Sequence, residues 1–388
     1  MKSNLSTICD YRKGKVDVAT LTHLSYISTE NMLPNKGGIT SAASLPTISQ
    51  TQEYRKGDVL VSNIRPYFKK IWKAKTDGGC SNDVLVFAAK DGTDPDFLYY
   101  VLADDSFFEY SMATSKGTKM PRGDKTSIMR YQVPSIDIST QRRIASILRS
   151  LDDKIELNTE INNNLLQQAS TIFKHWFTDN PNLDTMEQVP LAELCSVVTK
   201  GTTPTTLGKP FASEGINFIK AESILDNHAI DKDKFAFIDS ETNDLLRRSI
   251  INEGDIVFTI AGTLGRFALI DDSILPANTN QAVAIIRANQ SKVTPEYLYS
   301  FFLGNWHIDY YTKRIQQAVQ ANLSLGTIKS LPIPTLSEKA MADYLGIISP
   351  IIQMTKANEL EITRLRTMRD ALLPQLMSGE LDVSSLDL

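Results

Sequence analysis

Two basic segments in the first half of the chain carry side chains suited to binding a polyanion. Residues 65–75 hold five basic residues, no acidic residue and the aromatic rings of Tyr67, Phe68 and Trp72. Asp124 is the one acid within a second cluster, which comprises Lys116, Lys119, Arg122, Lys125 and Arg130. Such segments favour contacts with nucleic-acid phosphates. The alternative interpretation is a solvated strand face followed by a basic loop.

The second half of the chain carries a different set of polar side chains. The segment 262–266, Gly-Thr-Leu-Gly-Arg, has one cation, and amides gather at Gln316, Gln317, Gln320 and Asn322. Gln and Asn can read adenine edges, whereas Arg and Lys read guanine. If both halves bind DNA, we therefore expect them to read different sequences.

The sequence contains no catalytic motif that we can identify. The loop 201–210 resembles a phosphate-binding loop, but six residues instead of four separate Gly201 from Gly208, and Pro210 stands where Ser or Thr would bind magnesium. Hydrolase, zinc-protease and dinucleotide-binding signatures are also missing. The histidines are isolated from one another; they are His23, His175, His228 and His307. We expect no metal site and no catalytic residues.

Composition places the chain among ordinary soluble globular proteins. The hydrophobic fraction is 42 % and the charged fraction 22 %, which disfavours disorder. Cys9, Cys80 and Cys195 are too few and too far apart for a disulfide framework. Because no apolar run is long enough to cross a membrane and the N-terminus lacks a signal sequence, we expect a cytoplasmic protein. The net charge of −4 argues weakly against a nucleic-acid partner.

An internal repeat relates the two halves, with an offset that grows from 186 to 200 residues. The matching segments are 5–9 with 191–195, 26–33 with 218–225, 56–60 with 253–257, 81–87 with 279–285, 94–99 with 294–299, and 133–134 with 333–334. Six matches in one order, with the drift that loop insertions produce, indicate two homologous halves. Each half has a globular part followed by a helical part.

The globular parts have the pattern of α+β domains. Short runs rich in β-branched residues predict strands at 58–62, 83–87, 255–259 and 281–286. Each half also has one clear helix start, with a capping residue (Asp94 or Thr294) followed by proline. These starts predict helices over 95–114 and 295–318.

The helical parts carry heptad-like apolar seams. The first would be ~55 Å long if helical over 141–177; its seam has the polar Asn158 on it and includes Ile144, Leu148, Leu151, Ile155, Leu165 and Ile172. The second seam includes Leu345, Ile348, Ile352, Ile362, Leu365 and Leu372. We expect this second helix to kink or restart at Ser349-Pro350, to loosen at Pro374 and to end at Gly379.

Two long helices from equivalent positions of a repeat most simply pack on each other. We expect an antiparallel coiled coil that joins the globular parts across a pseudo-twofold axis. The alternative is that each helix packs on its own domain.

Several motifs resemble the specificity (S) subunits of type I restriction–modification enzymes. The strongest are the helical segments 141–158 and 369–381, and the resemblance extends to 56–58, 62–66, 262–265 and 333–334. Ser337-Glu-Lys-Ala-Met341 departs from the Glu-Gln-Arg entry to the second helix that such subunits have.

This resemblance implies target-recognition domains at 1–140 and 181–336, and coiled-coil helices at 141–180 and 337–388. It implies that each domain reads half of a bipartite, asymmetric DNA site and that the helices set the spacer. It further implies that two modification (M) subunits dock on the helices and methylate adenine at N6 with S-adenosylmethionine, and that restriction (R) subunits, where present, use ATP and Mg²⁺ for cleavage. The S subunit itself would hold no cofactor and no catalytic residue.

The DNA contacts expected from these patterns lie in both halves. For the first half-site they are Arg65, Lys69, Lys70, Trp72, Lys116, Lys119 and Arg122. For the second they are Lys220, Arg266, Gln320 and Asn322. Alternative functions are a DNA-binding subunit of a related type II or methylation-only system, an active methyltransferase or single-chain restriction enzyme, and a coiled-coil scaffold without a DNA role. The enzyme would need a cofactor fold for which no residues remain unassigned.

Overall fold

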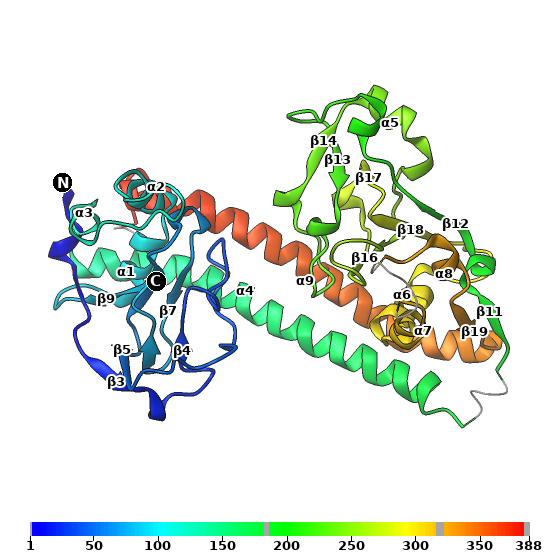
Figure 1. Cartoon of the computed structure of the whole chain (residues 1–388), viewed down its shortest axis with the longest axis horizontal. Helices are drawn as coiled ribbons and strands as arrows, with labels where there is room; N and C mark the ends of the chain where they lie inside the picture. The colour runs from blue at the N-terminus through cyan, green and yellow to red at the C-terminus, as the bar shows by residue number, and fades with distance from the viewer. Residues whose placement is uncertain (1, 182–185, 316–321, 384–388) are drawn as a thin grey trace. The chain divides into compact units, whose positions relative to one another are not determined.

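The computed structural model describes residues 2–181, 186–315 and 322–383, which form two compact units (Figure 1). Unit 1 comprises Met1–Glu156 and Ile362–Leu388, and unit 2 comprises Leu157–Glu361. Two long helices, α4 (Ile138–Phe173) and α9 (Glu338–Ser378), contribute residues to both units. Each unit therefore combines a globular part with a portion of both long helices.

Three sheets build the globular part of unit 1. Their strand orders are β1-β10, β2-β9-β6-β7 and β3-β5-β8-β4, all antiparallel except the β4–β8 pair. The strands are β1 (Lys2–Asn4), β2 (Cys9–Tyr11), β3 (Lys15–Asp17), β4 (Tyr26–Ile27), β5 (Gln50–Tyr54), β6 (Val59–Ser62), β7 (Ile71–Lys73), β8 (Gly78–Cys80), β9 (Val84–Ala89) and β10 (Gln132–Pro134). The short helices are α1 (Pro95–Ala103), α2 (Asp105–Ala113) and α3 (Lys125–Ile128).

Unit 2 repeats this plan with one strand fewer among its described residues. Its sheets have the orders β11-β19, β12-β18-β15-β16 and β14-β13-β17, with β13 and β17 parallel. The strands are β11 (Gln188–Pro190), β12 (Cys195–Lys200), β13 (Ile216–Ile219), β14 (Ala236–Ile238), β15 (Ile256–Thr259), β16 (Phe267–Leu269), β17 (Ala277–Thr279), β18 (Val283–Ala288) and β19 (Pro332–Pro334). The short helices are α5 (Ser240–Leu245), α6 (Pro295–Leu303), α7 (Trp306–Ile315) and α8 (Leu325–Lys329).

The β2-β9-β6-β7 sheet of unit 1 and the β12-β18-β15-β16 sheet of unit 2 are each buried on both faces. On β6, Val59 and Val61 lie in the core that also contains α1 and α2, whereas Leu60 lies in the core shared with the neighbouring sheet. On β15, Phe258 and Val257 divide in the same way between two cores. Because side chains alternate along a strand, a strand with two buried faces has a continuous apolar sequence. The four strands predicted from such runs are present.

In both units, the turn just before the strand β6 or β15 ends at a buried aspartate. Asp58 accepts a hydrogen bond from its own turn, at the backbone N of Arg55 (2.8 Å), and from the guanidinium of Arg12. Asp255 does the same with Asn252 N (2.8 Å) and Arg287. The repeated Gly-Asp motif thus builds a turn, while the two arginines come from different places in the repeat.

Each predicted short helix is in fact two helices. Asp104 adopts an extended backbone and caps α2 by accepting from Ser106 N, which separates α2 from α1. In unit 2, Gly304 and Asn305, the latter with φ 59°, separate α6 from α7. The predictions of single helices over 95–114 and 295–318 are therefore wrong, and 316–318 lie outside the described residues. Both capping predictions are confirmed: Asp94 accepts from Asp96 N and Phe97 N, and Thr294 from Tyr297 N.

The long helices are close to their predicted extents. Asp137 accepts from the backbone N atoms of Ser139 and Thr140, so α4 begins three residues before the predicted Gln141. The helix α9 is one α-helix from Glu338 to Ser378, and a restart at Ser349 is wrong. Gly379, with φ 78°, follows its last residue as predicted.

The two long helices run antiparallel within each unit. In unit 1, Ile144 and Leu148 of α4 share a core with Leu373 and Leu376 of α9. In unit 2, Asn162, which follows Leu148 along α4, pairs with residues of α9 that come before Leu373. The Asn162 amide donates to Thr355 O at 3.1 Å, and its Oδ1 accepts from the Asn358 amide at 2.8 Å. Contacts that move forward along α4 thus move backward along α9.

The helices also pack on the globular parts. Ile144 and Leu148 lie in the core beneath the β2-β9-β6-β7 sheet of unit 1. Phe173 lies in the core of unit 2 that also contains α6. Helix–helix packing and helix–domain packing, which the sequence left as alternatives, therefore both occur.

Candidate nucleic-acid interface

The loop between β6 and β7 joins three distant segments into one surface of unit 1. Arg65 N donates to Pro121 O at 2.8 Å, and Lys36 N donates to Lys69 O at 2.9 Å. A 3-10 turn at Pro66–Phe68 exposes the rings of Tyr67 (49 %) and Phe68 (37 %). We call the segments 35–36, 65–70 and 116–122 together the basic surface.

Carboxylates of unit 1 pair with most cations of the basic surface. Lys36 and Lys69 both contact Asp105, at 2.9 and 2.8 Å. Although partial burial opposes the effect, hydrogen bonds from the two lysines hold the pKa of Asp105 below its usual value. The sequence prediction did not include Lys36. Its place on the basic surface depends on backbone hydrogen bonds to the distant segment 68–69, and no local sequence pattern predicts these bonds.

The hairpin over 116–122 brings two more predicted cations to this surface. Lys116 pairs with Asp124 at 2.5 Å, and Arg122 pairs with Asp83 at 3.1 Å. Hydrogen bonds from Lys116 and Ser127 lower the pKa of Asp124 to about 2. Such exposed ion pairs contribute little to stability, so phosphates can replace these carboxylates at low cost.

Three predicted cations, Arg65, Lys70 and Lys119, form no ion pair with an acidic residue within the part of the chain that the structure describes. Lys119 is exposed between Lys116 and Arg122. Arg65 is half-buried, and its Nε is buried without a hydrogen-bond partner. A ligand would not have to displace a carboxylate from Arg65 or Lys119.

Lys70 and Trp72 point into the domain more than away from it. Lys70 Nζ donates to Thr29 O at 2.6 Å, and burial lowers its pKa. Trp72 is half-buried and packs edge-on against Tyr54, with ring centroids 5.8 Å apart. Their assignment to DNA stays a prediction, and the geometry favours packing roles.

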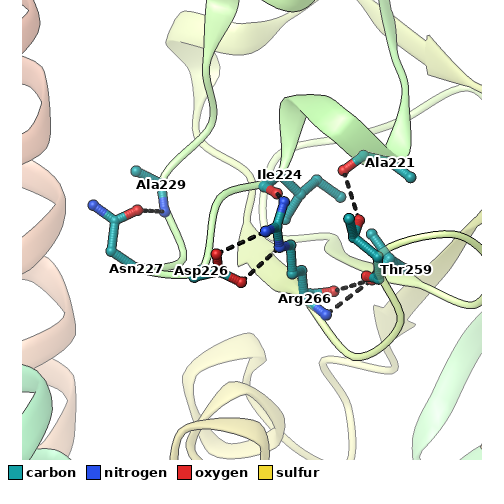
Figure 2. Close-up of polar contacts among 8 residues, drawn as sticks. Ala221, Ile224, Asp226, Asn227, Ala229, Thr259 and Arg266 are labelled. Carbon is teal, nitrogen blue, oxygen red and sulfur yellow. Dashed lines mark hydrogen bonds and ion pairs between the residues drawn. The ribbon is translucent and has the colours of Figure 1, made fainter. Parts of the chain in front are cut away.

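The loop between β15 and β16 of unit 2 is built around Arg266. Figure 2 shows its guanidinium in a two-bond contact with Asp226, at 2.6 and 2.7 Å, while its main chain bonds to Thr259. Such a fork-shaped contact is strong among surface pairs. Lys220 pairs likewise with Glu222 at 2.9 Å. Both cations would have to exchange a carboxylate for a phosphate or a base.

Of the amides predicted for the second half-site, one lies among the described residues. Asn322 is exposed in the segment before α8, whereas Gln320, Gln316 and Gln317 lie outside the described residues. Their DNA contacts stay predictions.

Every one of the twelve predicted seam residues on the long helices is shielded from solvent. Six are buried, namely Ile144, Leu148, Ile155, Ile348, Ile352 and Ile362. Six are half-buried, namely Leu151, Leu165, Ile172, Leu345, Leu365 and Leu372. The seams therefore mark the helix faces that pack within each unit, and a docking role for them stays a prediction.

A family model described as the type I restriction modification DNA specificity domain matches residues 2–167 and 184–364. The chain belongs to this family. The two matches cover both globular parts and portions of both long helices, and the fold class predicted from the sequence, two homologous mixed α/β domains with two long helices, is confirmed.

Curated relatives that match most of the chain are named specificity subunits of type I restriction enzymes. The HindI specificity subunit of Haemophilus influenzae is 25 % identical over 95 % of this chain and 96 % of its own. The MjaIX specificity subunit of Methanocaldococcus jannaschii is 24 % identical over 76 % of this chain and 71 % of its own. The solved S subunit from M. genitalium shares the fold, with a TM-score of 0.57, 15 % identity and coverage of 99 % and 96 %.

The described parts of the specificity domains hold no assembled metal site. Among those residues, no group of three or more His, Cys, Asp or Glu side chains could hold a metal ion. None of the described helices is long and apolar enough to span a membrane.

Proposed function

We propose that this chain is the DNA-recognition subunit of a type I restriction–modification complex. Each specificity domain reads one half of a bipartite, asymmetric DNA site. The observation that carries this proposal is the double family match, which assigns a DNA specificity domain to each half of one chain.

The loops of the two domains support an asymmetric site. The loop 63–70 carries Arg65, Lys69 and Lys70, whereas the loop 260–266 carries Arg266 as its one cation. Side chains of different type read different bases. The two half-sites should therefore differ in sequence even though the domains share one fold.

The long helices act as the spacer element in this proposal. With 36 residues, α4 is ~54 Å long at 1.5 Å per residue, which corresponds to about 16 base pairs of B-DNA. This length holds two readers at least one DNA turn apart.

Catalysis belongs to partner subunits in this proposal. Two M subunits dock on the helices, bind S-adenosylmethionine and methylate adenine at N6 after flipping the base out of the duplex. R subunits add ATP- and Mg²⁺-dependent cleavage. The support is that relatives matched over 95 % and 76 % of this chain are named specificity subunits of type I restriction enzymes.

Methylation mapping tests the proposal. Cells that express this chain with its M subunit should acquire N6-methyladenine at a bipartite motif with two defined half-sites and a constant spacer. Cells with the M subunit alone should lack it. Methylation at the same sites without this chain, or a single continuous motif, would contradict the proposal. Cleavage of unmodified DNA after addition of a partner R subunit would separate a restriction system from a methylation-only one.

A further inference from the structure

The hairpin loops of the two domains share the hydrogen bond that closes them, although their sequences differ and the loop of unit 1 is one residue longer. Ser62 N donates to Lys70 O at 3.0 Å, and Thr259 N donates to Arg266 O at 2.8 Å. These bonds identify Ser62 with Thr259 as the first residues of equivalent loops. Counting three residues on from each places Arg65 in the position that Gly262 occupies in unit 2.

This backbone position has a positive φ in both units. The φ angle is 51° at Arg65 and 77° at Gly262. Counting one residue back from Lys70 and Arg266, which close the loops, Lys69 with φ 48° corresponds to Gly265 with φ 90°. Glycine adopts this conformation freely, whereas a side chain makes it unfavourable. The loop therefore needs a left-handed residue, and unit 1 places an arginine where unit 2 has the residue that fits.

The contacts of Arg65 within the chain do not explain this choice. Its neighbour Lys69 pairs with Asp105, and Arg122 pairs with Asp83. Arg65 has no acidic partner in the described part of the chain, and its buried Nε has no acceptor. The half-buried side chain of Arg65 thus has no carboxylate that a ligand would have to displace, and the exposed residues Tyr67 and Phe68 follow it in the same loop. Residues held in unfavourable backbone conformations cluster at ligand sites.

We propose that Arg65 occupies a glycine position because its guanidinium contacts the DNA of the first half-site. This inference rests on the proposed function and assigns one residue to it. Arginine suits the role because its planar donors bind a phosphate or the O6 and N7 atoms of guanine in a two-bond contact. Unit 2, with Gly262 at this position, makes no equivalent contact.

Two substitutions separate the side chain from the backbone. Arg65→Ala removes the guanidinium and keeps the unfavourable φ, while Arg65→Gly removes both. In the complex of the full chain with its M subunits, both variants should bind a duplex selected by the wild type from a randomised DNA pool about 5- to 100-fold more weakly. Arg65→Gly should nevertheless melt about 2–4 °C above Arg65→Ala. Arg55→Ala is the matched control, because it removes the same charge from an exposed side chain of unit 1.

The outcomes separate this inference from the function on which it rests. Wild-type affinity in both Arg65 variants, with intact selection by the wild type, overturns the inference and leaves the proposed function standing. Failure of the wild-type complex to select any motif overturns both. A loss shared by all sequences, with a shallower salt dependence, assigns Arg65 to phosphate, and relaxation at one motif position assigns it to a base; either supports the inference.

Discussion

The guanidinium of Arg369 on α9 donates a hydrogen bond to the carboxylate of Asp152 on α4 across 2.8 Å. Tyr100 of α1 donates to the other oxygen of the same carboxylate, also at 2.8 Å. Asp152 and Arg369 both lie in the two helical motifs that carry the family resemblance. These motifs therefore meet at an ion pair that joins three helices of unit 1.

Arg369→Met should destabilise unit 1 by about 1–3 kcal/mol, because it leaves the half-buried Asp152 carboxylate with one donor fewer. Urea unfolding followed by circular dichroism measures the change. Arg364→Met, on an exposed position of α9, should stay within about 0.5 kcal/mol of the wild type. Asp152→Asn in the Arg369→Met background should add much less than it does alone, and full additivity would contradict the coupling.

A second prediction concerns the glycine between α6 and α7. Gly304 lies against the ring of the fully buried Phe173, which a Cβ at this position would overlap. Gly304→Ala should therefore cost about 1–3 kcal/mol in thermal or urea unfolding, since overpacking forces neighbouring groups to move. Gly346→Ala is the matched control in α9, because a Cβ there meets nothing within 4 Å. It should stabilise the chain by about 0.5–1 kcal/mol. Equal effects of the two substitutions would refute the packing argument.

Unit 2 should lose stability in mild acid because of the buried His307 and the half-buried His228. His228 stacks on Phe267 at 4.0 Å, and His307 lies edge-on to the same ring. Burial lowers the pKa of each histidine to about 4, while Asp226 opposes the shift of His228 and Lys356 adds to it. The folded pKa lies below the unfolded value of about 6.5, so only the unfolded state takes up protons between these pH values.

The stabilising effect of the neutral histidines is therefore complete above pH ~6.5 and is lost as the pH falls toward 4, by on the order of 2–3 kcal/mol for each ring. Urea midpoints between pH 7 and 4 measure the loss. His228→Gln and His307→Gln should each flatten this dependence, even where they lower stability at pH 7. A pH dependence unchanged by both substitutions would exclude the histidines as its source.

The spacer prediction follows from the pairing of Asn162 with Asn358 in unit 2. Removing the heptads 157–163 from α4 and 354–360 from α9 deletes both partners together and shortens the helices by ~10 Å. The methylated motif should keep its half-sites and lose about three base pairs of spacer. Sequencing of methylated DNA reads both quantities at once. Altered half-sites with an unchanged spacer would contradict a ruler role for the helices.

The sequence by itself determined the features that depend on local or periodic patterns. The repeat predicted two domains of one fold, because equivalent strands need equivalent apolar runs. Asp94 and Thr294 predicted the helix starts, because a capping side chain accepts hydrogen bonds from backbone N atoms within three residues of itself. The seams on α4 and α9 predicted the packed helix faces, because burial on a helix follows its period.

Only the tertiary structure decided the features that depend on distant residues. The Gly304-Asn305 pair is a local sign of a helix end, but the packing of Gly304 against Phe173, which lies in another helix, depends on chain folding. The helix α9 continues through Pro350, where Pro350 and Gly346 are both exposed and water can satisfy the carbonyl that the missing N–H leaves free. The cations of the basic surface follow the same logic: Lys36 and Lys69 meet at Asp105 through chain folding, and the pairing of a charge depends on its neighbours in space.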